Sequence, residues 1–392
     1  MQLGLISSSN YNFGMIARNY YYWQLDYWKR RGIPGPPGMI FLGNMYELTD
    51  RSKPVGLVLR EWTKTYGKVY GIQEGLRRVI VISDVDMIRE LFIKKFDYFY
   101  GRKNNVIGGD VENDSRVHVF EAQGVRWKRL RAISSPAFSS GSLKKVLLRN
   151  LDFRFYKEFT MDVICRIAMG QQGSEMFKNK KKVATIDSVG VIRHEKKIYL
   201  LIKIAAQCFV FLLAGFDTTA TSLAFVTYLL AKNPRVQQIL QEEIDQLSDS
   251  ETINYETLSS MKYLDSVMKE SLRIYPLANI ANSRRCMKST TLGPITVEEG
   301  EFVMVDTMSL HFDRDLWGND AEEFRPERWT ESTERSSAAF LSFGLGPRQC
   351  IGMRLAHMEE KLVLVHLLRR YDIIATNDTE VILLFVLLRP RL

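Results

Sequence analysis

The longest run of helical hydrophobic periodicity lies near the middle of the chain, from Tyr199 to Lys232. It predicts one helix of over thirty residues, which ends at Asn233-Pro234 because proline cannot continue a helix. The first half is apolar enough to suggest a membrane span, but three polar side chains would be costly in lipid: Lys203, Gln207 and Asp217. A long helix buried in a protein core fits the pattern better.

Shorter patterns predict a mainly α chain with small β-sheets. Helices are expected at Val55 to Tyr66, Val85 to Lys95, residues 124–131 and after Ile351, and β-rich runs at Val69 to Gln73, Arg78 to Ser83 and Thr296 to Met304. Residues 101–122 are polar and rich in glycine, asparagine and aspartate, which is typical of a loop.

One cysteine at the start of the last predicted helix carries the strongest chemical signal. Cys350 lies between Gly346 and Gly352, two residues after Arg348. Glycines let backbone N–H groups approach the sulfur, and a helix N-terminus and an arginine would stabilise negative charge on it. A buried thiolate without such support is too costly to keep. These surroundings suit a thiolate ligand to haem iron. The alternative is a small, inert, buried cysteine.

The positions around this cysteine resemble the haem-binding loop of the cytochrome P450 family. They are Phe343, Gly344, Gly346, Pro347, Arg348, Cys350 and Gly352. The resemblance implies a cytochrome P450 fold and haem b (iron protoporphyrin IX) as the cofactor. It implies that Cys350 is the axial iron ligand and that Arg348 reaches a haem propionate. Phe343 and Gly352 would be further cofactor-binding residues of the loop.

Two further motifs resemble parts of the family that hold the haem. Trp127 and Arg131, at i and i+4, share one face of a predicted helix, so an indole N–H and a guanidinium could grip one carboxylate. In the family such a pair contacts haem propionates, whereas alone the motif is usually a solvated helix face. Arg284 stands where the family often has another propionate-binding arginine, and Arg285 is its rival for that role.

The centre of the long predicted helix resembles the oxygen-binding helix of the family. Asp217 and Thr218 follow Gly215, and a threonine within a helix can turn its hydroxyl onto the carbonyl four residues earlier. We expect Asp217 to be buried and Gly215 to open room beside it. The resemblance implies that Asp217 and Thr218 deliver protons to dioxygen. The alternative is a polar defect in a core helix.

A charged pair, Glu270 and Arg273, lies at i and i+3 on a helix that is apolar on several sides, so we expect the pair to be buried. A buried ion pair needs further partners to offset desolvation, and Arg328 in a downstream Pro-Glu-Arg motif can supply them. The resemblance implies that these three residues form a structural triad behind the haem loop. Trp329 stands where phenylalanine is commoner in the family.

The amino-acid composition limits the kinds of partner that we expect this protein to bind. The 392 residues carry 54 lysines and arginines against 45 aspartates and glutamates, a formal net charge of +9. Such a surplus suits an anionic membrane surface or an acidic protein partner. The sequence contains no zinc or nucleic-acid motif, so we expect no nucleic-acid partner. The cysteines are far apart and form no CxxC pair, which is typical of a reducing compartment: Cys165, Cys208, Cys286 and Cys350.

Residues 1–33 have the flank of a membrane anchor without its apolar span, because polar residues interrupt the first 28 positions. The aromatic run from Tyr20 to Trp28 precedes Lys29 to Arg31, which is typical of a membrane interface. A stiff hinge from Pro34 to Gly38 follows, and residues 34–392 are expected to form the haem domain. The resemblance implies the cytosolic face of the endoplasmic reticulum membrane.

The resemblance breaks between Trp127 and Gly215, an interval considerably shorter than in the family. We expect the haem domain to be shortened at about residues 150–198 and again at the C-terminus. Several helices of the distal roof, which covers the substrate pocket in the family, would then be missing.

Together these features predict a haem-thiolate monooxygenase that inserts one oxygen atom from O2 into an apolar small molecule. Its electrons would come from a separate NADPH-dependent flavoprotein reductase, because the chain lacks a GxGxxG motif, and Lys128 and Arg129 are candidates for docking it. One alternative is a truncated haem-binding or inactive remnant of such an enzyme. The other is a membrane transport subunit that uses residues 198–230 as a span.

Overall fold

The computed structural model describes residues 15–16, 18–103, 111, 114, 116–142, 163–164, 195–247, 253–331, 334–376, 379 and 387–391. These residues belong to two compact units. Unit 1 comprises Met1–Gly108, Ala278–Ala321 and Arg335–Gln349, and unit 2 comprises Gly109–Leu277, Glu322–Glu334 and Cys350–Leu392. Three subjects of the sequence predictions lie largely or wholly outside the described residues: the start of the membrane-proximal segment, Cys165 and the expected shortening at about residues 150–198.

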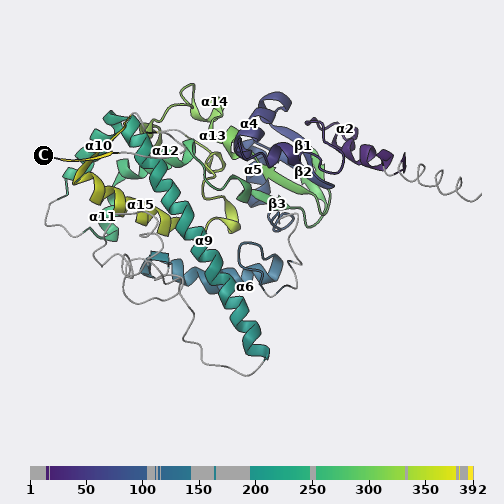
Figure 1. The fold of residues 1–392 in the computed structure, drawn as a ribbon, viewed down its shortest axis with the longest axis horizontal. Coiled ribbons are helices and arrows are strands. Elements are labelled where there is room, and N and C mark those ends of the chain that lie inside the picture. The colour runs from purple at the N-terminus through teal and green to yellow at the C-terminus, as the bar shows by residue number, and fades with distance from the viewer. Residues whose placement is uncertain are drawn as a thin grey trace, which may run out of the picture. The chain divides into compact units, whose positions relative to one another are not determined.

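Unit 1 is built around a four-stranded sheet with the strand order β1-β2-β6-β3 (Figure 1). The hairpin of β1 (Val69–Glu74) and β2 (Arg77–Ile82) is antiparallel. Strand β2 then pairs in parallel with β6 (Phe302–Val305), which pairs antiparallel with β3 (Ser283–Arg285). Residues 79–82 of β2 are fully buried. An unbroken apolar run is what a strand covered on both faces requires.

The other elements of unit 1 are short. They are α2 (Tyr27–Arg30), α3 (Met45–Leu48), α4 (Val55–Tyr66), α5 (Val85–Arg89), α13 (Thr307–His311), α14 (Arg314–Trp317), β4 (Thr290–Leu292) and β5 (Ile295–Val297). The helix predicted from Val85 continues beyond α5 as a π-helical turn, Glu90–Lys94. The strands predicted from Thr296 to Met304 are present as β5 and β6 (Phe302–Val305). Strands β5 and β6 belong to different sheets, because a turn at Gly300, with φ of 87°, separates them.

Unit 2 is mainly helical. Its elements are α6 (Gly124–Ser134), α9 (Glu195–Lys232), α10 (Pro234–Asp245), α11 (Tyr255–Ser260), α12 (Lys262–Ile274), α15 (Met353–Leu368), β7 (Tyr371–Ile374) and β8 (Leu387–Pro390). Helix α9 ends at Lys232 as predicted, because Pro234 occupies the first turn of α10. The predicted mainly α fold with small sheets is confirmed.

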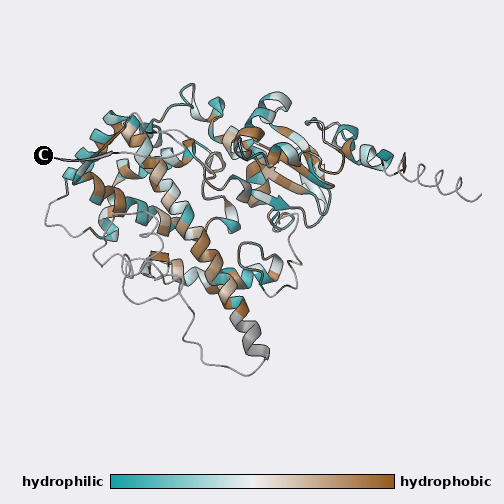
Figure 2. Ribbon diagram, viewed as in Figure 1, coloured by the Kyte–Doolittle hydropathy of each residue, from teal (hydrophilic) through white to brown (hydrophobic). Residues whose placement is uncertain are grey.

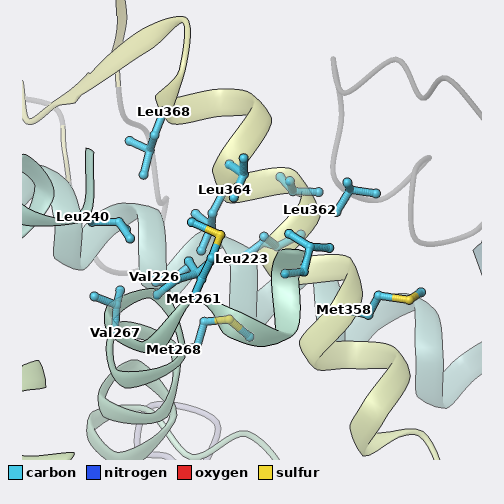
Figure 3. Packing of buried hydrophobic residues seen from close by; sticks show 14 of the residues in the cluster. Leu223, Val226, Leu240, Met261, Val267, Met268, Met358, Leu362, Leu364 and Leu368 are labelled. Atoms are coloured by element: carbon cyan, nitrogen blue, oxygen red, sulfur yellow. The ribbon is translucent and has the colours of Figure 1, made fainter. Parts of the chain in front are cut away.

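The core of unit 2 gathers around the second half of α9 (Figure 3). Buried side chains of four helices pack together there: Leu223, Val226, Leu240, Val267, Met268, Met358, Leu362, Leu364 and Leu368. The first half of α9 differs. It is hydrophobic over most of its described length (Figure 2), yet Ile204, Phe209 and Leu213 are exposed. The prediction of a buried core helix is therefore correct for the second half of α9 and wrong for the first.

The membrane alternative for this helix rests on composition. Within the described part of the chain, Ile202–Lys232 is the one helix long and apolar enough to cross a membrane. Length and composition are weak support, because the core helix of a soluble protein passes the same test. The burial of Leu223 and Val226 in the core of unit 2 favours the protein interior for the second half.

Candidate haem-thiolate site

The sulfur of Cys350 stands immediately before α15, the helix whose start the sequence predicts near Ile351. Gly352 is the N-cap residue of α15 and makes no side-chain cap, and a Cβ built on it would lie 3.9 Å from Cys350 Sγ. The sulfur thus lies beside a helix end whose free N–H groups and macrodipole stabilise negative charge. These positions bring together a thiol and the dipole that supports its thiolate.

Cys350 differs from Cys286 in its exposure. Cys350 is exposed, whereas Cys286 is fully buried and its pKa is raised to about 11 by that burial. A thiol in apolar surroundings with a raised pKa is inert, whereas a metal ion can reach an exposed one. Of these two cysteines, Cys350 is the one suited to binding a metal.

Helix α6 carries the predicted Trp127 and Arg131 pair. Trp127 is buried and Arg131 is half-buried, while Lys128 and Arg129 on the same helix are exposed. Burial lowers the pKa of Arg131, and the charge of Cys350 acts in the opposite direction and raises it. The structure therefore couples Arg131 electrostatically to the sulfur itself, a relation that the sequence did not predict. Residues far apart in the sequence become neighbours only when unit 2 folds.

A cluster of arginines lies in unit 1. Arg284 on β3 and Arg348 are both buried, and Arg102 donates hydrogen bonds to the carbonyls of Ala281 (2.7 Å) and Arg348 (3.4 Å). The pKa of Arg284 lies well below its ordinary value, first because of burial and then because of repulsion from Arg102 and Arg348. Like charges held together away from water call for an anion between them.

The surroundings of Arg284 show whether this cluster suits a haem carboxylate. Its Nη1 donates to the Ser283 carbonyl at 2.8 Å and its guanidinium lies 4.3 Å above the ring of Phe92, but its buried Nε has no hydrogen-bond partner in the described ranges. A buried guanidinium with a spare N–H fits a propionate well. Arg285, its neighbour on the strand, is only half-buried, so the structure favours Arg284 of the two rivals.

The loop that precedes Cys350 is fixed by close backbone approach. Gly346 has φ of 72°, and a Cβ built on it would lie 2.2 Å from the carbonyl oxygen of Phe92. Only glycine is accommodated where two backbones come so close. Phe343 is half-buried in the same loop.

Arg102, which completes the arginine cluster, was missed by the sequence prediction because nothing in its local sequence distinguishes it from a surface arginine.

The predicted triad is present in unit 2, and its burial is confirmed. Both oxygens of Glu270 are engaged: Arg273 donates from Nε (2.9 Å) and Nη2 (2.8 Å), and Arg328 donates from Nε (2.8 Å). All three side chains have no exposed surface. The backbone N–H of Arg325 (3.1 Å) and the indole of Trp329 (2.9 Å) add two more hydrogen bonds. Trp329, which the sequence showed only as a departure from phenylalanine, is therefore a partner of the carboxylate.

The centre of α9 departs from the prediction in two respects. Asp217 and Thr218 are exposed, and only Thr219 turns into the core. Successive residues of a helix point about 100° apart, so one of three neighbours can be buried while the others are not. The space beside Gly215 is filled by Ile164, because a Cβ on that glycine would lie 2.8 Å from Ile164 Cδ1. Thr218 does donate its hydroxyl to the Ala214 carbonyl, as predicted.

Comparison with known proteins identifies the class to which these features belong. The family model for cytochrome P450 matches residues 33–154 and 191–390, so the chain belongs to the cytochrome P450 family. Among its relatives in Caenorhabditis elegans, the putative cytochrome P450 CYP13A10 is 39% identical over 498 aligned positions, which cover 97% of this chain and 96% of that protein. The putative cytochrome P450 CYP13A2 is 38% identical over 514 positions and is covered completely, as is this chain.

Family membership settles the general chemistry. Cytochromes P450 bind haem, and the chain is in general terms a haem-thiolate monooxygenase, an oxidoreductase that uses O2, a redox partner and apolar substrates. The predicted family, fold and cofactor are confirmed. The family model leaves residues 155–190 unmatched, and the aligned positions outnumber the 392 residues of this chain, so each alignment contains positions that only the relative fills.

Proposed function

We propose that this protein inserts one oxygen atom from O2 into an apolar small molecule, with electrons from a separate NADPH-dependent flavoprotein reductase. We place it at the cytosolic face of the endoplasmic reticulum membrane. The observation that carries the proposal is the placement of Cys350 directly before the N-terminus of α15, which is supported by the electrostatic effect between Cys350 and Arg131. The haem, when bound, supplies the activation of dioxygen, and a thiolate ligand favours cleavage of the O–O bond.

Residues of unit 2 would hold the haem iron. Cys350 would supply the thiolate ligand, and Gly352 leaves the sulfur uncrowded. The half-buried Arg131 provides a positive charge that neutralises excess negative charge next to the sulfur. The indole N–H of Trp127 and the guanidinium of Arg131 also suit a propionate, because a planar fork of donors binds a carboxylate strongly.

In unit 1, Arg284 and Arg348 would hold propionate oxygens when haem is bound. Both are buried, and a carboxylate beside them would relieve the repulsion that lowers the pKa of Arg284. Arg102 is a third cation of this set, and Phe343 is an apolar contact on the same loop. Removing one of these arginines should weaken haem binding more than removing an exposed arginine.

Asp217 and Thr218 move protons. The Thr218 hydroxyl donates to the Ala214 carbonyl, which fixes its orientation and leaves its oxygen lone pairs to accept a hydrogen bond from water. Asp217 is exposed, so its carboxylate is in reach of solvent water. The two side chains together suit the passage of a proton from solvent to dioxygen.

The reductase docks on α6. Lys128 and Arg129 are exposed there, on the helix that also carries Arg131, and the chain as a whole has a net charge of +9. Exposed cations steer an acidic partner and raise its association rate. Because α6 also carries Arg131, an electron from a reductase docked on α6 would have a short distance to travel to the residues beside the Cys350 sulfur.

A second candidate function is a haem-binding or inactive remnant, with the domain shortened at about residues 150–198. Two observations favour the shortening: the family model omits residues 155–190, and the relatives fill alignment positions that this chain lacks. In unit 2, Val125 and Ile133 on α6 and Phe209 and Leu213 on α9 are exposed apolar side chains. A missing roof would leave such side chains uncovered. The membrane transport alternative has no comparable support.

The test is the absorption spectrum of the reduced protein with carbon monoxide. Cys350→Ala should abolish the red-shifted Soret band that a thiolate ligand produces, because the mutant has no sulfur to donate to the iron. Cys286→Ala, which removes a fully buried thiol, is the matched control and should keep the band. A Cys350→Ala protein that keeps the band would refute the ligand assignment.

A further inference from the structure

A buried histidine in unit 1 contacts the loop that leads to Cys350. His311, the last residue of α13, has no exposed surface. Its Nε2 accepts a hydrogen bond of 2.9 Å from the backbone N–H of Leu341. An imidazole nitrogen accepts only when it carries no proton, so the ring is neutral and holds its proton on Nδ1. The described residues contain no group of three or more histidine, cysteine, aspartate or glutamate side chains suited to a metal ion, so His311 serves here as a hydrogen-bond acceptor.

The ring of His311 is held in one orientation by its neighbours. It stacks on the ring of Phe340, with centroids 5.4 Å apart and an angle of 17° between the two planes. The ring of Trp317 meets it edge to face, with centroids 6.4 Å apart. Trp317 is itself buried and donates its indole N–H to the Leu310 carbonyl at 3.0 Å. Because a closely packed interior restricts side-chain movement, the acceptor atom of His311 has a fixed place.

Asn282 holds the carbonyl of the same leucine. This asparagine is buried and directly precedes β3, the strand that carries Arg284. Its Nδ2 donates to the Leu341 carbonyl and to Thr307 Oγ1, both at 3.0 Å, so both hydrogens of the amide are used. The N–H and the C=O of Leu341, which is fully buried, are therefore each bonded to a buried side chain.

These two hydrogen bonds fix the start of a turn that contains Phe343. The Leu341 carbonyl also accepts the N–H of Gly344 at 2.9 Å, which closes a four-residue turn around Ser342 and Phe343. Gly344 has φ of 72°, and a Cβ built on it would lie 3.4 Å from Asn282 Oδ1. The side chain of Asn282 thus lies against both ends of the turn.

A second anchor holds the loop beyond the turn, where Gly346 lies against the Phe92 carbonyl. Residues 341–346 are therefore held at both ends, with the half-buried Phe343 between the two anchors. A buried backbone group that loses its hydrogen-bond partner is costly, so loss of His311 or Asn282 would weaken the first anchor.

We propose that His311 and Asn282 are positioning residues for the haem. They hold the backbone of Leu341 so that the turn after it presents Phe343 to the cofactor and so that the loop reaches Cys350 in the correct conformation. This inference rests on the proposed haem contacts of the loop. Sequence reasoning missed His311, because the 30 positions that separate it from Leu341 hide the contact.

Two substitutions of His311 separate its hydrogen bond from its packing. His311→Phe keeps a flat ring against Phe340 but has no acceptor for the buried N–H of Leu341. His311→Gln loses the ring but supplies an amide oxygen that accepts this N–H. Each variant is made in the full chain with haem, and the rate at which haem transfers to apomyoglobin is measured. His311→Phe should raise this rate about tenfold, because an unpartnered buried donor destabilises the loop, whereas His311→Gln should stay within about twofold of the wild type.

Amide hydrogen exchange provides a readout that does not depend on turnover. The peptide from Leu341 to Gly344 should exchange about tenfold faster in His311→Phe and in Asn282→Leu, and His311→Gln should restore its protection. The ferrous carbon monoxide complex of His311→Phe should lose part of the red-shifted Soret band. His366→Phe, at a half-buried histidine of α15, is the matched control and should change none of these measurements.

Faster haem loss from His311→Gln than from His311→Phe would show that the histidine acts by packing and would overturn the inference. Faster exchange of the peptide with unchanged haem transfer would overturn it too, because the loop would then be held without any effect on the haem. If His311→Phe does not fold, Asn282→Leu decides: faster exchange and faster haem transfer support the inference, and wild-type values refute it. A Cys350→Ala protein that keeps the red-shifted band would refute the proposed ligand, whereas the exchange measurements would still report on His311.

Discussion

Replacing Glu270 by alanine should destabilise unit 2 more than any other single change among the proposed site residues. Its carboxylate has no exposed surface and accepts five hydrogen bonds, four from side chains and one from a backbone N–H. In Glu270→Ala the buried guanidinium groups of Arg273 and Arg328 lose the carboxylate that they share. Removing one partner of a buried ion pair costs about 3–5 kcal/mol, a large share of the roughly 5–15 kcal/mol that stabilises a domain.

The assay is urea unfolding followed by circular dichroism, with haem content measured on the same preparations. Glu270→Ala should lower the free energy of unfolding by about 3–5 kcal/mol and yield mostly haem-free protein. Trp329→Phe removes only the indole donor and should cost about 1–3 kcal/mol. Glu242→Ala, at an exposed glutamate of α10, is the control and should stay within about 0.5 kcal/mol of the wild type.

Two results would contradict the reasoning. A Glu270→Ala protein within about 1 kcal/mol of the wild type, and loaded with haem, would show that the two arginines are solvated in solution. Equal effects of Glu270→Ala and Glu242→Ala would show that the loss of a glutamate anywhere in unit 2, and not the buried network, governs stability.

Three further predictions concern protons and the pocket. Thr218→Ala should consume O2 but release more hydrogen peroxide per product, since proton transfer by a positioned group contributes about 10²–10⁴-fold; an unchanged ratio of peroxide to product would leave Thr218 without a catalytic role. Burial raises the pKa of Glu360 to about 8. The folded protein therefore keeps the Glu360 carboxyl protonated at pH values where the unfolded chain, with an ordinary pKa near 4.5, has released that proton. The free energy of unfolding consequently falls between about pH 4.5 and pH 8, by about 1.4 kcal/mol per pH unit. Glu360→Gln, whose side chain stays neutral, should lose less stability than the wild type between pH 5 and pH 8 in urea unfolding, and equal losses would contradict this. A longer form with added helices between residues 153 and 199 should bind haem and turn over substrate better than this chain, since a covered pocket excludes water and leaves less apolar surface exposed. Equal haem occupancy and turnover of the two forms would show that added helices are dispensable.

Local patterns determined much of unit 2. The period of the apolar residues and the proline at 234 specified where α9 ends, because proline removes a hydrogen bond that the helix needs. The spacing of Glu270 and Arg273 specified a pair on one helix face, because residues three apart are neighbours there. The glycines around Cys350 led us to expect backbone N–H groups close to the sulfur, and this stays a prediction; the structure shows Gly346 close to the Phe92 carbonyl.

Tertiary packing decided what spacing could not. Whether Asp217 is buried depends on which side of α9 the other helices cover, and they cover Thr219 instead. The electrostatic effect of Cys350 on Arg131, the hydrogen bond from Arg102 to the Arg348 carbonyl and the indole hydrogen bond from Trp329 to Glu270 join residues from distant parts of the sequence. Hydrophobic periodicity in the sequence shows only that one side of a helix or strand is apolar. Burial, charge and hydrogen bonding at each atom depend on the neighbours that folding brings, and those neighbours are a property of the tertiary structure.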